Sequence, residues 1–173
     1  GFTLLEYLIY IGIVAMVLVA MLDFAWVLMN DQAKQEITAD LNDLGVHSLD
    51  QMTYYGHRAR SISPTTVYNT NPGTLIFSFS SGPDVIFDTY QDNIMVGDIP
   101  VTITKLRMEE AGGSQVDLTS DRVDVTDFVI TDLSGVNSTT INIDLTFESV
   151  NPEESKVYES ENSWSTTITR RAH

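Results

Sequence analysis

Residues 1–30 read GFTLLEYLIYIGIVAMVLVAMLDFAWVLMN and carry one acid near each end of an apolar run, Glu6 and Asp23. No charged residue lies between Tyr7 and Leu22. A helix over residues 3–29 would be about 40 Å long, which exceeds the ~30 Å hydrocarbon core of a bilayer. The stretch therefore predicts a helix that either spans a membrane or is surrounded by other helices.

The two acids are the first candidate functional residues, because an unpaired carboxylate inside such a segment costs several kcal/mol. Glu6 has two interpretations. It could pair with the N-terminal ammonium of a neighbouring subunit, or it could lie solvated at the headgroup interface, close to a favourable helix N-terminus. Asp23 could be a second partner between subunits, or it could mark where the helix leaves the lipid.

The string GFTLLE, followed by an apolar helix, resembles the N-terminal signature of bacterial type IV prepilins and of type II secretion pseudopilins. The resemblance covers about the first third of the chain. It implies that a prepilin peptidase cuts after Gly1 and that Phe2 becomes the methylated N-terminus. It also implies that Glu6 recruits the subunit into a filament.

The sequence departs from the family pattern at two points. Gly1 is present, although the family would leave it on the discarded leader. The first proline is Pro64, whereas many pilins carry a proline late in the apolar stretch, where the helix unwinds in the filament. Local unwinding near Asp23 is therefore not expected.

Composition narrows the possible partners. The chain has 173 residues and no cysteine, which excludes a disulfide framework and thiolate chemistry. It carries 24 Asp and Glu against 9 Lys and Arg, a net charge of −15. Such a surface suits an extracellular environment and argues against nucleic acid as a partner of the head, since phosphate binding needs a basic surface. The first basic residue is Lys34, consistent with a translocated C-terminal side.

An amphipathic pattern continues through residues 31–63. Its apolar positions recur every three or four residues, and Ser48 occupies the position between Leu44 and Met52. The apolar positions are Ile37, Leu41, Leu44, Met52, Tyr55, Ala59 and Ile62. Pro64 disfavours the α region for the residue before it, so one helix is predicted from Phe2 to Ile62. Gly45 and Gly56 are poor helix formers at which it could bend.

After Pro64 the pattern changes to period two. Six alternating runs predict antiparallel strands: residues 75–79, 84–88, 101–106, 122–130, 139–147 and 164–169. The first two flank Ser81-Gly82-Pro83, which predicts a hairpin. The expected fold class is α+β, a type IV pilin-like lollipop with a long N-terminal helix packed on one antiparallel β-sheet head. Its expected parts are a membrane or filament-core segment at 1–30, the amphipathic segment at 31–63 and the head at 64–173.

Enzymatic chemistry is not expected. His47 and His57 are ten residues apart on the predicted helix, which does not suit a paired metal site, and no serine lies in a G-x-S-x-G elbow. Two groups of acids in the head could supply oxygen ligands for calcium, which some pseudopilins use: Asp121, Asp124 and Asp127, and Glu153, Glu154 and Glu159. Neither group matches the twelve-residue calcium loop, so no metal site is predicted and calcium remains an alternative. Asn137-Ser138-Thr139 is a glycosylation sequon in a predicted turn.

The predicted function is a structural subunit of a type IV pilus-like extracellular filament. The resemblance implies a homopolymer held by helix–helix packing, residence in the cytoplasmic membrane before assembly, and prepilin peptidase and an assembly platform as partners. The nearest alternative is a minor pilin or type II secretion pseudopilin that primes or caps a filament. Residues 118–125 and 166–171 resemble parts of the heads of larger minor pilins and J-type pseudopilins. A monomeric membrane-anchored surface binding protein is the second alternative.

Overall fold

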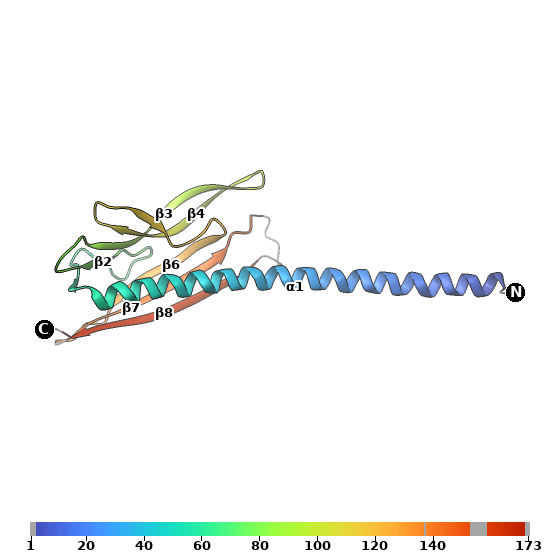
Figure 1. Ribbon diagram of the computed structural model, residues 1–173, viewed down its shortest axis with the longest axis horizontal. Coiled ribbons are helices and arrows are strands. Elements are labelled where there is room, and N and C mark those ends of the chain that lie inside the picture. The colour runs from blue at the N-terminus through green and yellow to red at the C-terminus, as the bar shows by residue number, and fades with distance from the viewer. Residues whose placement is uncertain (1–2, 137, 153–158, 172–173) are drawn as a thin grey trace.

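A computed structural model describes residues 3–136, 138–152 and 159–171 of the chain. One long helix, α1, projects from a β-rich head that packs along the helix's C-terminal half (Figure 1). The expected α+β architecture, a long N-terminal helix packed on antiparallel strands, is confirmed. The described elements are α1 Leu4–Arg58, β1 Ser61–Ile62, β2 Leu75–Ser78, β3 Val85–Val96, β4 Ile99–Glu110, β5 Gln115–Asp117, β6 Val123–Asp132, β7 Ser138–Ser149 and β8 Glu161–Arg171.

Helix α1 has 55 residues and is about 80 Å long. It ends at Arg58, before the predicted end at Ile62, and this part of the prediction was wrong. Ala59 is already extended, with φ −61° and ψ 147°. Ser61 and Ile62 instead pair with β2. The sheet thus supplies backbone partners just ahead of Pro64, where continuing the helix is disfavoured.

The described strands form two antiparallel sheets rather than the single sheet that was expected. One has the order β1-β2-β3-β4-β5 and the other β6-β7-β8. The predicted hairpin between residues 75–79 and 84–88 is confirmed as the β2–β3 pair. The two sheets approach each other where β4 lies beside β6. Period-two alternation could not show this division, because it records which residues face the core and not which strand is the neighbour.

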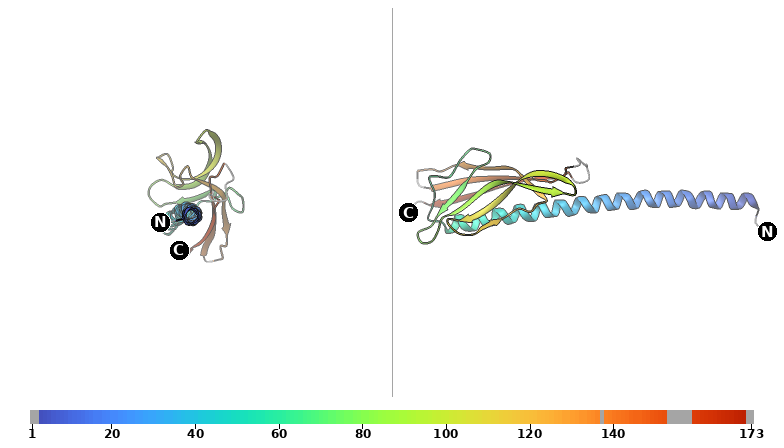
Figure 2. Two further views of the ribbon diagram at one scale, coloured as in Figure 1. Left: turned by 90° about the vertical axis from the view of Figure 1, so that its right-hand side faces the viewer. Right: turned by 90° about the horizontal axis from the view of Figure 1, so that it is seen from above.

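The core lies between α1 and the two sheets. Leu41, Ser48 and Met52 are buried on α1, which confirms this part of the predicted helical stripe, and Ala59 is buried just after the helix ends. The helix packs mainly on β7 and β8, and viewed along its axis it lies at the margin of the head (Figure 2). The largest fully buried side chains of the strands are Phe77, Phe87, Phe128, Phe147, Leu75, Ile103, Leu106, Ile130, Ile141 and Ile143.

Gly45 and Gly56 let α1 approach the head closely, and neither interrupts the helix. A Cβ built on Gly45 would lie 2.6 Å from the indole ring of Trp164, and one on Gly56 would lie 2.8 Å from a methyl group of Ile168. These two β8 side chains therefore fill the space that a larger helical residue would need. The positions expected to weaken the helix are the ones at which it contacts the sheet.

Candidate assembly surface on the N-terminal helix

The N-terminal half of α1 presents an apolar surface all round. Its large hydrophobic side chains, from Leu4 to Met29, are 44–83% exposed. Among the described residues α1 is a helix long and apolar enough to cross a membrane. The C-terminal half of the same helix buries one stripe of side chains against the head, so the head covers its apolar face. The first half needs lipid or other helices to cover it.

Thr3 and Glu6 form the start of this helix. Thr3 is the N-cap, with an extended backbone, and its hydroxyl accepts a hydrogen bond of 3.3 Å from the Glu6 N–H. This is half of a capping box, the S/T-x-x-E pattern in which a threonine satisfies a free N–H of the first turn. The N-cap role of Thr3 was not predicted, although residues 3–6 match the T-x-x-E pattern of a capping box.

Glu6 lies in the first turn of α1, partly exposed, and takes part in no ion pair within the described part of the chain. Its negative charge is favourable near the positive end of the helix dipole. Gly1 and Phe2, the predicted processing residues, lie outside the described residues. The structure therefore places Glu6, the assembly candidate, at the start of the exposed apolar half of α1.

Asp23 lies on a different side of the helix from Glu6. The two are 17 residues apart, which corresponds to about 25 Å along the axis and about 100° around it. Asp23 is exposed and borders a shallow hollow of about 410 Å³ lined by Ala15, Met16, Val19 and Ala20. The two acids therefore do not form one site within a single chain.

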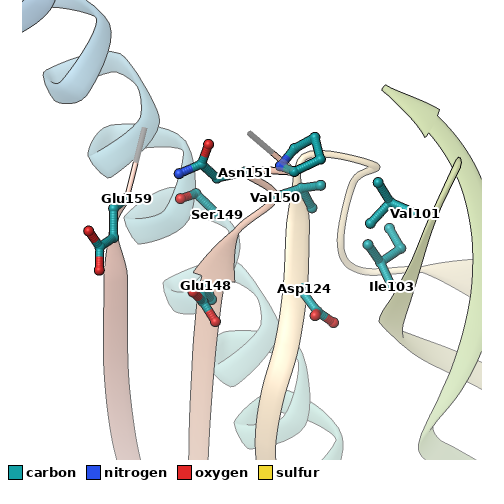
Figure 3. A pocket seen from close by; sticks show the side chains of 9 residues that line it. Val101, Ile103, Asp124, Glu148, Ser149, Val150, Asn151 and Glu159 are labelled. Atoms are coloured by element: carbon teal, nitrogen blue, oxygen red, sulfur yellow. The ribbon is translucent and has the colours of Figure 1, made fainter. Parts of the chain in front are cut away.

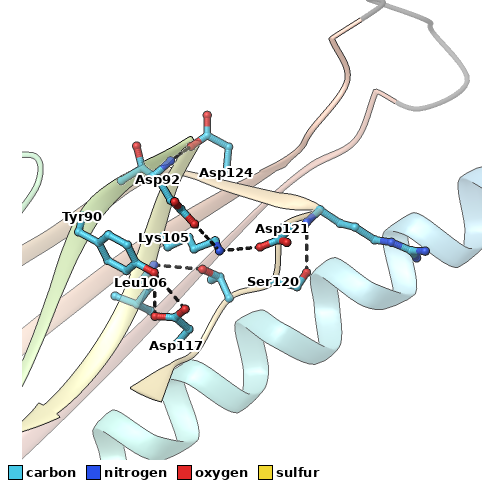
Figure 4. A network of polar contacts seen from close by, with 11 residues as sticks. Tyr90, Asp92, Lys105, Leu106, Asp117, Ser120, Asp121 and Asp124 are labelled. Atoms are coloured by element: carbon cyan, nitrogen blue, oxygen red, sulfur yellow. Dashed lines mark hydrogen bonds and ion pairs between the residues drawn. The ribbon is translucent and has the colours of Figure 1, made fainter. Parts of the chain in front are cut away.

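A charge network that the sequence did not reveal lies in the head, at the junction of the two sheets (Figure 4). The Lys105 ammonium on β4 lies 2.8 Å from a carboxylate oxygen of Asp92 on β3 and 2.5 Å from one of Asp121. Its side chain is only 8% exposed. Asp121 belongs to the segment between β5 and β6. The lysine therefore ties the β3–β4 hairpin to the chain that enters the second sheet.

The hydrogen bonds to Asp121 and Asp92 raise the pKa of Lys105. The hydrogen bond from Lys105 in turn lowers the pKa of Asp92. A carboxylate whose pKa is lowered on folding contributes stability above its unfolded pKa, near 4, and that stability is lost as the pH falls through its lower folded pKa. The contribution of this pair should therefore be present at neutral pH and disappear in acid.

Lys105→Met should lower the thermal midpoint of the head by at most about 4–8 °C at pH 7, because Asp92 and Asp121 lose their cation but are exposed enough for water to screen their charges. The difference from wild type should shrink as the pH falls from about 5 towards 2, since wild-type Asp92 becomes protonated there as well. Thermal unfolding of both proteins, followed by circular dichroism between pH 2 and pH 7, measures this difference. Lys34→Met is the control, because Lys34 is exposed and makes no ion pair with the described residues. A difference that does not depend on pH would assign Lys105 a packing role.

The first group of acids considered as calcium ligands, Asp121, Asp124 and Asp127, has protein partners. Asp121 binds Lys105, while Asp124 accepts the Thr104 N–H at 2.7 Å. Asp127 accepts a hydrogen bond of 2.6 Å from the Asn71 amide. No group of three His, Asp or Glu side chains that could hold a metal ion occurs in the part of the chain that the structure describes.

A cavity of about 420 Å³ lies between the ends of β4, β6 and β7 (Figure 3). Asp124, Glu148 and Glu159 line it together with Val101 and Ile103. The Asp124 carboxylate points towards β4, where its partner Thr104 lies. The other candidates of the sequence, Glu153, Glu154 and the sequon residue Asn137, lie outside the described residues.

Comparisons of the chain with models of protein families, with curated proteins and with solved structures find no match.

Proposed function

We propose that this chain is a structural subunit of a type IV pilus-like extracellular filament, assembled through α1. The observation that supports it most is the division of α1 into two halves. Residues 4–29 expose apolar side chains on every side, whereas residues 41–56 bury one stripe against the head. The GFTLLE string, with Glu6 in the first helical turn, supports the family.

Assembly would exchange one apolar surrounding for another. Before assembly the apolar half of α1 lies in the cytoplasmic membrane and the head lies outside. In the filament, helices from many subunits replace the lipid, and association is driven by their packing and by polar contacts between them. Subunits related by a rotation that does not close generate an open helical polymer. Glu6, paired with the N-terminal ammonium of a neighbour, would set the axial register.

The family proposal also supplies the processing steps and partners. A prepilin peptidase would cut between Gly1 and Phe2, and an assembly platform would extract the subunit from the membrane. The acidic head, in a chain with a net charge of −15, is not expected to bind nucleic acid by itself.

Electron microscopy of filaments sheared from expressing cells, with mass spectrometry of the N-terminus, tests the proposal. Filaments built mainly of this chain and beginning at methylated Phe2 are the expected result. Trace amounts of the chain in filaments of another protein would assign it to the minor pilins or pseudopilins. Abundant membrane protein without any filament would overturn the polymer and favour a monomeric, membrane-anchored binding protein.

A further inference from the structure

Several edges of the two sheets are covered by the chain itself. Residues 69–73 lie along the outer edge of β6, where the Gly73 N–H donates to the Phe128 carbonyl oxygen at 2.7 Å. Beyond the end of β5, the Leu118 N–H donates to the Leu106 carbonyl oxygen of β4 at 2.8 Å. Strands β1 and β5, at the two ends of the first sheet, are only two and three residues long. Covering loops and short edge strands are the usual protection against pairing with another chain.

Strand β8 is a long edge strand that lacks this protection. It pairs with β7 without a bulge, from Glu161 opposite Glu148 to Arg171 opposite Ser138. No other segment of the described chain forms backbone hydrogen bonds along its outer edge. Between Glu161 and Arg170 the strand contains no charged residue, no proline and no glycine. Such an edge presents a row of backbone N–H and C=O groups to which a further strand can bind.

The ladder between β7 and β8 defines which residues present this edge. The Ser149 N–H donates to the Ser160 carbonyl oxygen at 2.9 Å. Because backbone groups alternate in an antiparallel pair, the even-numbered residues of β8 turn their N–H and C=O groups towards β7. The odd-numbered residues turn theirs outwards. These outward residues, whose side chains are also exposed, are Glu161, Ser163, Ser165, Thr167 and Thr169.

The second half of β3 is another long edge without a strand beside it among the described residues. Strand β2 pairs with β3 only as far as Phe87, so residues 88–96 have β4 alone as their neighbour. The Ala111 N–H donates to the Asp84 carbonyl oxygen, which places the even-numbered residues of β3 towards β4. The residues that turn outwards are uncharged: Thr89, Gln91, Asn93 and Met95.

We infer that the outer edge of β8 pairs with the outer edge of β3, residues 88–96, of a second copy of the chain. The inference rests on the proposed function and adds to it a backbone-paired contact between heads, separate from the packing of the helices. Recognition of this kind uses main-chain hydrogen bonds for affinity. The outward residues from Ser163 to Thr169 and those of β3 are uncharged, so pairing places no carboxylates opposite each other in a chain of net charge −15.

Strand β8 runs in the same direction as α1. Near its start Trp164 lies against Gly45, and further along Ile168 lies against Gly56. The beginning of β8 is therefore beside the middle of the helix, and its end is beside the helix C-terminus.

Strand β3 runs in the opposite direction. Phe87, near its start, packs edge-on against Tyr55 with ring centroids 6.0 Å apart. Val96, at its end, lines the same groove as Ala33. In a second copy whose helix points the same way, as a filament requires, β3 is therefore antiparallel to β8 and lies beside the same stretch of α1.

The two edges also lie on opposite margins of the head (Figures 1 and 2). Each copy can then use β8 towards one neighbour and β3 towards the other. Such a contact joins two different surfaces, and it generates an open polymer when the rotation between copies does not close. The strand contact is thus compatible with the symmetry of the proposed filament.

Cysteine crosslinking between heads tests the contact, because the natural chain has no cysteine. Ser165→Cys and Gln91→Cys chains would be co-expressed and their sheared filaments treated with a short bismaleimide. The expected product is a dimer of one chain of each variant, since residues on paired strands lie within a few ångströms of each other. Ser165→Cys with Leu133→Cys, at a residue that is 55% exposed in the turn between β6 and β7, is the matched control.

The outcomes separate the inference from the proposed function. Filaments that give no mixed dimer, or that give as much dimer in the control pair, would overturn the strand contact alone. Dimers formed by Ser165→Cys chains without Gln91→Cys would overturn it as well, because they would pair β8 with β8. A wild type that forms no filaments would overturn the proposed function.

Proline at the edge of β8 gives a second test. Ser165→Pro removes an N–H that faces outwards and leaves the ladder to β7 intact, a position at which edge strands tolerate proline. Filament yield should fall at least about tenfold, because backbone groups of the partner strand lose their hydrogen bonds. Membrane-bound protein and the thermal midpoint of the head should not change.

Two variants of neighbouring chemistry are the controls for this proline. Ser165→Ala keeps the outward N–H and should form filaments normally. Thr166→Pro removes an N–H that faces β7, opposite Ile143, and should lower the thermal midpoint instead. Normal filament yield from Ser165→Pro would overturn the strand contact.

Discussion

Replacing Glu6 by Ala is expected to abolish filaments made of this chain while leaving its amount in the membrane unchanged. In the proposed filament the variant would leave the N-terminal ammonium of the neighbouring subunit without its carboxylate partner in an apolar environment. Removing one member of a buried pair costs about 3–5 kcal/mol. A cost of this size lowers the affinity for each added subunit by roughly 100-fold or more. Counting sheared filaments by electron microscopy and quantifying membrane protein by immunoblot measure both effects.

Glu6→Gln separates this pairing role from helix capping. Glutamine can keep the capping box with Thr3 but removes the charge, so pairing predicts loss of filaments and capping predicts their retention. Thr3→Ala is the converse control, because it removes the hydroxyl that accepts the Glu6 N–H and leaves the carboxylate in place. Filaments that persist in Glu6→Gln and disappear in Thr3→Ala would contradict the pairing role.

Replacing Gly45 by Leu should destabilise the head by about 1–3 kcal/mol, which corresponds to a fall in thermal midpoint of roughly 5–15 °C. The Cβ alone would lie 2.6 Å from the indole of Trp164, at atoms within the ring rather than at a flexible end. The indole cannot move away freely, because it packs edge-on against Phe147 with ring centroids 5.4 Å apart. The helix and β8 must separate instead. Thermal unfolding of the detergent-solubilised chain measures the loss.

A double-mutant cycle with Trp164→Ala shows whether the loss comes from this contact. Once the indole is absent, Gly45→Leu should cost much less, so the two changes should not be additive. Ala39→Leu, at an exposed position of the same helix, is the matched control and should have little effect, since alanine and leucine have similar helix propensities. Equal losses from Gly45→Leu with and without Trp164 would contradict the close approach.

The long helix, its two different halves and six of the strands could be predicted because each depends on a local pattern. The apolar run up to Met29, the stripe through Leu41 and Met52, and the alternation along residues 139–147 all repeat within a few residues. Glu6 and Asp23 could be identified for the same reason, since a charge within an apolar run is visible in the sequence. Their roles between subunits remain predictions.

Contacts between residues that are far apart in the sequence could not be predicted from such local patterns. Lys105 belongs to an ordinary alternating strand in the sequence, and only pairing with β3 and the arrival of residues 118–122 surround it with two carboxylates. By helix propensity alone Gly45 is unfavourable, and its role in letting α1 approach Trp164, 119 residues later, is visible only in the tertiary structure. The short strand β1 forms because the backbone of β2 is available to it.

The sequence alone therefore determined the elements and their surfaces: a helix apolar all round, then amphipathic, then strands with one face turned to a core. These follow from periodicity, which sets the direction of each side chain relative to its own backbone. The tertiary structure decided how those surfaces meet: the division into two sheets, the contact of Gly45 with Trp164, and the placement of Lys105 between two aspartates. Each of these depends on residues brought together across many positions of the chain, and no local period records such contacts.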